Sequence, residues 1–170
     1  MKSLVISLFA EDKPGIVDAL AKVVKQHQGN WLSSRFAHMA GQFAGFVEVN
    51  IAQDQAEPLL EALNALPGLT VHTADPVTAQ QPPMTTAYFS IMGNDKSGIV
   101  SEITSILQQF NVNILEFDSS CNSAPNWGSE MFTAQCKVAI PDGLDIDDVQ
   151  QALESIANDL MVDISFKKTS

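Results

Sequence analysis

The sequence repeats itself, and this feature limits the possible folds more than any other. A shift of 83 residues aligns Asp12-Lys13-Pro14-Gly15-Ile16-Val17 with Asp95-Lys96-Ser97-Gly98-Ile99-Val100. Nine identities fall within the 26 positions from Ser7 to Leu32, where about one or two are expected by chance. Because similar sequences fold alike, we predict two copies of one module.

The segment between the two copies differs from both in composition. It is rich in proline and glutamine and includes the pair Pro82 and Pro83, which is typical of an exposed linker rather than a packed element. We therefore predict a first module over residues 1–76, a linker over 77–85 and a second module over 86–170.

Hydrophobic periodicity predicts the same order of elements in both copies. In the first copy we expect a strand over 4–9, a helix over 15–28, strands over 31–39 and 43–52 joined at Ala40-Gly41, a helix behind a capping box of Asp54 and Glu57, and a strand over 69–73. In the second copy we expect a strand over 86–92, a helix over 98–109, strands over 113–120 and 130–140, a helix over 145–158 and a strand over 160–167.

This order is βαββαβ, the ferredoxin-like arrangement in which two helices cover one face of a four-stranded antiparallel sheet. The predicted fold class is therefore α+β, with two tandem ferredoxin-like modules. Such folds host unrelated functions, so the functional argument must come from particular residues.

Charge excludes one broad class of partner. The chain has 9 Lys and Arg against 20 Asp and Glu, a formal net charge of −11, and phosphate binding depends mainly on Lys and Arg. We expect no direct binding to nucleic acid. No segment approaches the about 20 apolar residues that span a bilayer, so we expect a soluble, cytoplasmic protein with no membrane partner.

The two cysteines are expected to be reduced thiols. Folding the second hairpin about its loop pairs Cys121 with about Glu130 and Cys136 with about Leu115, which keeps the two sulfur atoms apart. The pair also lacks the spacing of a zinc or redox motif.

The repeated Asp-Lys-x-Gly-Ile-Val segment is the candidate site. It lies at the turn from a strand to a helix, where free N–H groups and the helix dipole favour a carboxylate or another anion. Gly15 and Gly98 would let a ligand approach the backbone. Asp12 and Asp95 could meet an ammonium group or simply cap the helix, and the residues alone leave both interpretations open.

Asp-Lys-Pro-Gly-Ile-Val after a hydrophobic strand, followed by a helix and Gly-Asn-Trp-Leu, resembles the ACT domain, a small regulatory module that commonly binds amino acids. Two tandem copies with no appended enzyme resemble the glycine cleavage system transcriptional repressor family. The resemblance implies a ligand held between the strand–helix turn of one module and the region after the first helix of a neighbouring module. The ligand-binding residues it implies are Asp12, Gly15, Asn30, Asp95, Gly98 and Asn113.

The second copy departs from the motif. Ser97 stands in place of the usual proline, and the second hairpin has an expanded loop from Asn122 to Ser129. The loop is either a flexible connection or a partner-binding element with Trp127 as an exposed anchor. Trp31, in contrast, begins a strand and is expected to be packed or to form a binding surface.

Catalytic and metal-binding constellations find little support. His27, His38 and His72 are scattered along the chain, and none has a ligand-like spacing to another donor. Phosphate-binding glycine loops are absent from the sequence, and Gly41 and Gly45 are interpreted as serving a hairpin turn. The acidic cluster around Asp145 is interpreted as a helix cap. We expect no catalytic residue, no metal and no cofactor.

The function these observations predict is that of a non-enzymatic, amino-acid-responsive regulator, with glycine as the first candidate ligand. It would act by protein contacts on a transcriptional regulator protein, as a repressor of the glycine cleavage system type. The ACT-like modules would pair within the chain or as a homo-oligomer. The alternative is a ligand-independent oligomerisation or interaction module; an acylphosphatase-like enzyme is less consistent with the position of Arg35, the single arginine, on a hairpin strand.

Overall fold

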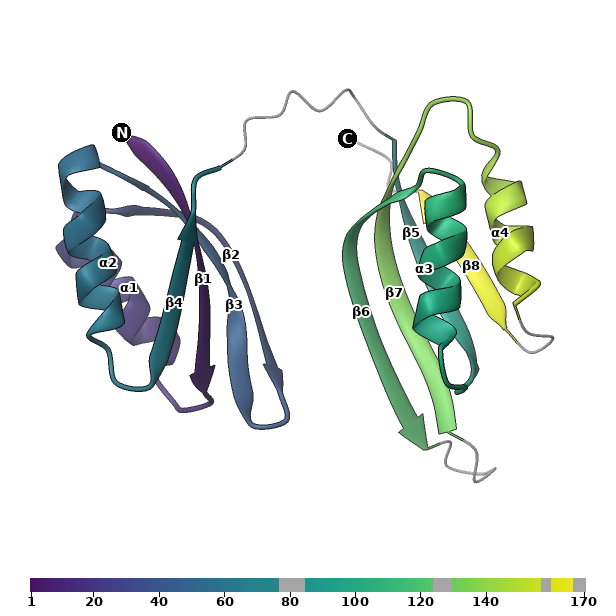
Figure 1. Ribbon diagram of the computed structural model, residues 1–170, viewed down its shortest axis with the longest axis horizontal. Coiled ribbons are helices and arrows are strands. Elements are labelled where there is room, and N and C mark those ends of the chain that lie inside the picture. Colours follow the sequence, from purple (N-terminus) through teal and green to yellow (C-terminus); the bar gives the residue numbers. More distant parts are fainter. Residues whose placement is uncertain (77–84, 124–129, 157–159, 167–170) are drawn as a thin grey trace. The chain divides into compact units, whose positions relative to one another are not determined.

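The computed structural model describes residues 1–76, 85–123, 130–156 and 160–166 (Figure 1). The chain divides into two compact units, Met1–Ala79 and Gln80–Ser170, which we call module 1 and module 2. Apart from Thr85, the predicted linker lies outside the described residues, so its role stays a prediction.

Both modules have the predicted βαββαβ order. Module 1 consists of β1 (Lys2–Glu11), α1 (Ile16–Gln26), β2 (Asn30–Met39), β3 (Gln42–Ile51), the short 3-10 helix η1 (Gln53–Gln55), α2 (Ala56–Asn64) and β4 (Leu69–Ala74). Module 2 consists of β5 (Thr85–Asn94), α3 (Ile99–Gln109), β6 (Asn113–Ser123), β7 (Glu130–Ile140), α4 (Ile146–Glu154) and β8 (Met161–Phe166).

Each module contains one four-stranded antiparallel sheet. The strand orders are β2-β3-β1-β4 and β6-β7-β5-β8, with antiparallel pairing between neighbours. In each module both helices lie on the same face of the sheet (Figure 1). The predicted α+β class with two ferredoxin-like modules is confirmed.

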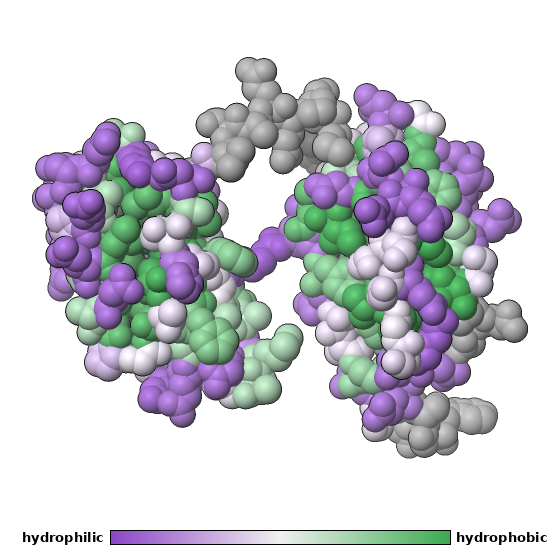
Figure 2. All heavy atoms as spheres, viewed as in Figure 1, coloured by the Kyte–Doolittle hydropathy of each residue, from purple (hydrophilic) through white to green (hydrophobic). Residues whose placement is uncertain are grey.

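The apolar residues predicted from periodicity form the two cores. In module 1, Leu4, Ile6 and Leu8 of β1 are buried against Leu20 and Val24 of α1. Burial of each such side chain stabilises the fold by about 1.5 to 3 kcal/mol. The core of module 2 contains the corresponding buried residues Phe89, Ile91, Ile103, Leu107, Val149 and Leu153. Hydrophilic residues cover the outer side of α1 and α2 (Figure 2).

Two glycines of the first hairpin have different roles. Ala40 and Gly41 have φ values of 49° and 78°, as the two central residues of a tight hairpin turn require. Gly45 does not serve the turn, contrary to the prediction, because it lies within β3 opposite Phe36. A Cβ atom at Gly45 would collide with the carbonyl oxygen of Arg35. This glycine therefore permits β2 and β3 to approach closely.

The predicted helix caps have mixed outcomes. Asp145 caps α4, since its Oδ1 accepts a hydrogen bond of 3.0 Å from the backbone N–H of Asp147. The capping box of Asp54 and Glu57 is wrong: η1 precedes α2, and no described side chain caps that helix. The 3-10 turn leads the chain into the helix without a side-chain acceptor.

The register of the second hairpin also corrects a prediction. Cys121 pairs with Phe132 and Cys136 with Phe117, each two residues beyond the expected partner, because β6 continues to Ser123 before the loop. Both thiols are free, with Cys121 exposed and Cys136 buried. Separate thiols are therefore confirmed.

Candidate functional site

The strand–helix turn of module 1 is built around Gly15. This residue precedes α1 with φ 93°, in the left-handed region, and no described side chain accepts a hydrogen bond from the first turn of α1. Asp12 is therefore not a helix cap. Its backbone N–H donates to the carbonyl of Gly41 at 3.0 Å, and its Oδ2 lies 3.6 Å from Nε2 of His38.

Module 2 repeats this turn around Gly98. Gly98 precedes α3 with φ 87°, again with no side-chain cap among the described residues. The backbone N–H of Asp95 donates to the carbonyl of Glu130 at 2.8 Å, which ties the turn to the start of β7. Both modules thus have a helix N-terminus with no side-chain cap behind a left-handed glycine, although the N–H of Ile99 in module 2 donates to the carbonyl of Lys96 at 3.2 Å. The remaining N–H groups of such a terminus suit a bound anion.

The space beside both glycines is open. A Cβ atom at Gly15 or Gly98 would meet no other atom within 4 Å. The positive φ values favour glycine, and the open space leaves the backbone accessible to a ligand.

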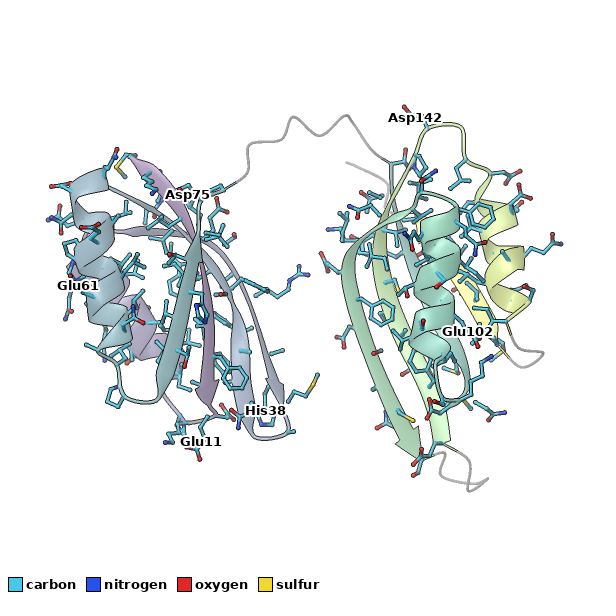
Figure 3. All side chains as sticks on the ribbon, in the orientation of Figure 1. Glu11, His38, Glu61, Asp75, Glu102 and Asp142 are labelled. Carbon is cyan, nitrogen blue, oxygen red and sulfur yellow. The ribbon has the colours of Figure 1, made fainter. Side chains whose placement is uncertain are left out.

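Asn30 and Asn113 lie at the opposite end of their modules from these turns. Glu11, next to Asp12, pairs with Gln42 at the hairpin end of the sheet, whereas Asn30 pairs with Asn50 at the other end. The 11 residues of α1 separate the two ends by about 16 Å. In Figure 3, Glu11 and His38 lie at one end of module 1 and Asp75 at the other. A single module therefore brings Asp12 and Gly15 together but not Asn30.

The region around Asn113 contains a hollow of about 380 Å³. It is lined mainly by polar side chains at the end of α3 and the start of β6, including Thr104, Gln108 and Asn111. Asn111 has φ 54°, so the chain leaves the helix through a left-handed residue. Asn113 therefore lies in a hollow at the end of module 2 that is remote from Asp95 and Gly98.

A second hollow adjoins the turn of module 1. It has a volume of about 120 Å³ and is lined by Glu11, Lys13, Ile16 and Ala19, together with the segment 66–69 after α2. The sequence reasoning missed this segment because Pro67-Gly68 indicates only a helix end. Its nearness to the turn is a consequence of the sheet order, which places β4 beside β1.

The corresponding lysine of module 2 is engaged differently. Lys96 Nζ lies 2.6 Å from Oε2 of Glu102 and donates to the carbonyl of Ile156 at 3.2 Å. Lys13 pairs only with its exposed neighbour Glu11, at 3.0 Å, among the contacts of the described residues. In module 2 the lysine therefore links α3 to the turn that follows α4, whereas in module 1 it borders an open hollow.

Other donors gather near the turns that the sequence reasoning did not place there. Besides His38 beside Asp12, Cys121 and Glu130 lie beside Asp95, and the donor atoms of these three residues are all within 4.8 Å of one another. Local desolvation and the neighbouring carboxylates of Asp95 and Glu130 raise the pKa of the Cys121 thiol. The sequence reasoning brought Cys121 near Glu130 but placed neither beside Asp95, because that contact depends on how the hairpin packs against the turn.

The structure tests the prediction for Trp31 but not the one for Trp127. Trp31 packs against the core of module 1, with its ring 6.1 Å from that of Phe36, so the packed interpretation is confirmed. Trp127 and most of the expanded loop, residues 124–129, lie outside the described residues.

Within the part of the chain that the structure describes, no helix has the length and apolar character needed to cross a membrane.

Comparison with known families identifies the class of module. Residues 2–71 and residues 87–167 both match the ACT domain model. The chain belongs to the ACT domain family, with two tandem domains that carry the glycine turns described above. These matches confirm the resemblance inferred from Asp-Lys-Pro-Gly-Ile-Val. ACT domains are amino-acid-sensing regulatory modules.

Two solved structures are similar over the whole chain. An unknown protein from Galdieria sulphuraria matches 98% of this chain and 98% of its own, with 27% identity and a TM-score of 0.82. A candidate glycine cleavage system transcriptional repressor matches 99% of this chain and 98% of its own, with 19% identity and a TM-score of 0.69. A search of curated proteins gives no match.

Proposed function

We propose that this protein is an amino-acid-responsive, non-enzymatic regulator that acts on a transcriptional regulator protein, as a repressor of the glycine cleavage system type. Membership of the ACT family supports amino-acid sensing. The fold shared with a candidate repressor of that system supports the narrower assignment. The observation that carries the proposal is the pair of uncapped helix N-termini behind Gly15 and Gly98.

The chemistry of these turns suits an amino acid. The N–H groups of the first helical turn would bind its carboxylate, and Asp12 or Asp95 would bind its ammonium group. Asn30 or Asn113 of another module would complete the site, because those residues lie at the far end of their own module. A ligand that needs two modules binds only when they are paired, which gives the differential affinity that regulation requires.

The charge of the chain supports action through a protein. With a net charge of −11, the surface would repel the phosphates of nucleic acid. A protein partner that itself binds DNA avoids this repulsion. A coupling of about 1 to 3 kcal/mol between ligand and partner would change the partner's affinity about 5- to 150-fold.

Thermal unfolding with a panel of amino acids, beginning with glycine, tests the proposal. Ligand at about 100 times its dissociation constant should stabilise the folded protein by about 2.7 kcal/mol. Gly15→Ala should remove the contribution of the module 1 turn to this shift and Gly98→Ala that of the module 2 turn, because the new methyl group occupies the space left for the ligand. Gly143→Ala is the matched control, since Gly143 has a similar φ of 79° and equally open surroundings, but lies away from both turns.

The outcomes separate strain from ligand binding. All three substitutions place alanine at positive φ and should each cost about 1 to 2 kcal/mol of stability. Only the two turn variants should lose the response to the amino acid. Absence of any shift in the parent protein, or retention of the full shift in both turn variants, would contradict amino-acid binding at these turns.

A ligand-independent interaction module is the second candidate. Phe9 and Phe46 alternate with the buried Leu8 and Val47, so they face away from the helices, and they are 52% and 58% exposed. Large exposed apolar side chains on one sheet face are typical of association surfaces. Self-association that depends on protein concentration but not on amino acids would favour this function.

A further inference from the structure

Three side chains of types that bind metals in proteins lie together at the β5–α3 turn of module 2. Asp95 comes from the turn, Cys121 from β6 and Glu130 from the first position of β7. One donor atom from each lies within 4.8 Å of the other two, and Cys121 Sγ lies 3.9 Å from Oε2 of Glu130. All three residues are exposed, so a dissolved ion can reach them.

The backbone of module 2 holds these groups together. The hydrogen bond from Asp95 N–H to the Glu130 carbonyl, at 2.8 Å, joins the turn to β7. Cys121 pairs with Phe132, and Glu130, two residues earlier, projects from the same face of the strand as Phe132. Cys121 and Glu130 are therefore diagonal neighbours across β6 and β7, at a distance that long side chains can span.

The separation between Cys121 and Glu130 is close to the ligand–ligand distance of a tetrahedral zinc site. Zinc binds thiolate at about 2.3 Å and carboxylate at about 2.0 to 2.2 Å, so tetrahedral ligands lie about 3.3 to 3.8 Å from one another. The 3.9 Å between Cys121 Sγ and Glu130 Oε2 requires only a small contraction. The nearby Lys96 pairs with Glu102 at 2.6 Å rather than with this cluster.

We propose that Asp95, Cys121 and Glu130 form a binding site for a borderline divalent cation of the zinc type. The sulfur ligand favours zinc over magnesium or calcium, which prefer all-oxygen sites. Binding neutralises the mutual repulsion of two carboxylates and a thiolate, and the thiol proton is released to solvent as the metal–sulfur bond forms. Three protein ligands leave the fourth tetrahedral position to water or to a further ligand.

Module 1 provides an internal comparison. At the equivalent positions it has Asp12 and His38, whose Oδ2 and Nε2 atoms lie 3.6 Å apart. The third position is occupied by Gly41, whose carbonyl bonds to Asp12 as that of Glu130 bonds to Asp95. Module 1 thus offers two side-chain donors and module 2 three, so the tighter site belongs to module 2.

Titration of the reduced full-length chain with zinc chloride tests the proposal. We expect one tightly bound ion per chain, with affinity at least about tenfold weaker in Asp95→Asn, Cys121→Ser and Glu130→Gln. Glu102→Gln and Cys136→Val are the controls, because they remove a nearby carboxylate and the other thiol without touching the cluster. Both should bind zinc as the parent does.

Cobalt chloride gives a second, spectroscopic measurement. Cobalt bound to the parent should show thiolate-to-metal charge-transfer absorption that disappears in Cys121→Ser and persists in Cys136→Val. Circular dichroism of each apo variant checks that the fold is retained. Zinc binding of equal strength in Cys121→Ser, or the absence of stoichiometric binding to the parent, would overturn the proposal.

Discussion

The two modules have the same fold and equivalent core positions, yet their strand–helix turns differ. In module 1, Lys13 and Ala19 border an open hollow. In module 2 the equivalent residues are Lys96 and Glu102, which form an ion pair of 2.6 Å. The two modules thus share the backbone conformation of the turn but differ in the side chains around it.

The sheet faces opposite the helices differ in a similar way. Phe46 of module 1, which is 58% exposed, corresponds to Gln135 of module 2, whose Nε2 donates to Ser90 Oγ at 2.8 Å. Glu48 accepts hydrogen bonds from Ser3 and Ser33, whereas its counterpart Lys137 pairs with Glu116. The outer face therefore differs in polarity between the modules, whereas equivalent core positions such as Val47 and Cys136 are buried and apolar in both.

Acidic residues are also unevenly distributed. Of the 20 Asp and Glu residues, 12 follow residue 85, and they include Asp95 and Glu130 of the proposed cation site. The first half contributes the remaining eight together with Arg35, the only arginine. Most carboxylates of the chain thus follow residue 85, in the half that contains the proposed cation site.

The largest expected effect concerns the close approach of β2 and β3. Gly45 of module 1 corresponds to the buried Ala134 of module 2, but a Cβ atom at Gly45 would collide with the carbonyl of Arg35. Gly45→Ala should therefore destabilise the protein by about 3 kcal/mol, measured by urea denaturation. The reverse change, Ala134→Gly, should cost about 0.5 to 1 kcal/mol. Equal losses of unfolding free energy in Gly45→Ala and Ala134→Gly would contradict the closer approach of β2 and β3.

A smaller effect is expected from the lysines of the two turns. Lys96→Met removes the ion pair with Glu102 and the hydrogen bond to the Ile156 carbonyl, and should reduce the free energy of unfolding by about 1 kcal/mol. Lys13→Met should change it by less than about 0.5 kcal/mol, since Lys13 and Glu11 are both well exposed. Chemical denaturation of both variants measures the difference, and a larger loss in Lys13→Met would contradict it.

The smallest effect concerns Cys136 and appears only at alkaline pH. Burial raises the pKa of the Cys136 thiol from 9.0 to about 11, so the unfolded chain loses this proton at lower pH than the folded protein. The resulting contribution to stability is intact below pH 9 and is lost as the pH rises through about 11.

The matched variant is Cys136→Val, because module 1 has the buried Val47 at the equivalent position. Below pH 9 this variant and the parent should differ by less than about 1.5 kcal/mol. Between pH 9 and 11 the parent should lose stability faster than the variant, as measured by unfolding at a series of pH values. Parallel pH profiles would indicate that Cys136 does not titrate with a raised pKa.

Most of the fold was predictable from local patterns. Alternation through Leu4, Ile6 and Leu8 identified β1, and the helical spacing of Ile16, Leu20 and Val24 identified α1. The capping box at Asp54 failed because a matching pair of side chains cannot show whether a 3-10 turn will precede the helix. The hairpin register at Cys121 failed because the pattern does not reveal where a strand ends beside a long loop.

The candidate site was predictable only in part. The repeated glycine at a strand–helix turn pointed to Gly15 and Gly98, and both have the positive φ that such a turn requires. The roles of Asp12 and Asp95 could not be decided locally, since an aspartate three residues before a glycine suits a cap as well as a ligand. The structure shows that neither caps its helix, because their contacts lie across the hairpin instead.

By itself, the sequence determined that this protein has two similar modules, the order of their strands and helices, and the glycine shared by their strand–helix turns. These features depend on interactions between residues close together in the chain. Only the tertiary structure decided that Cys121 and Glu130 lie beside Asp95. Those relations depend on strand order and register, which result from packing the whole module and not from any local pattern.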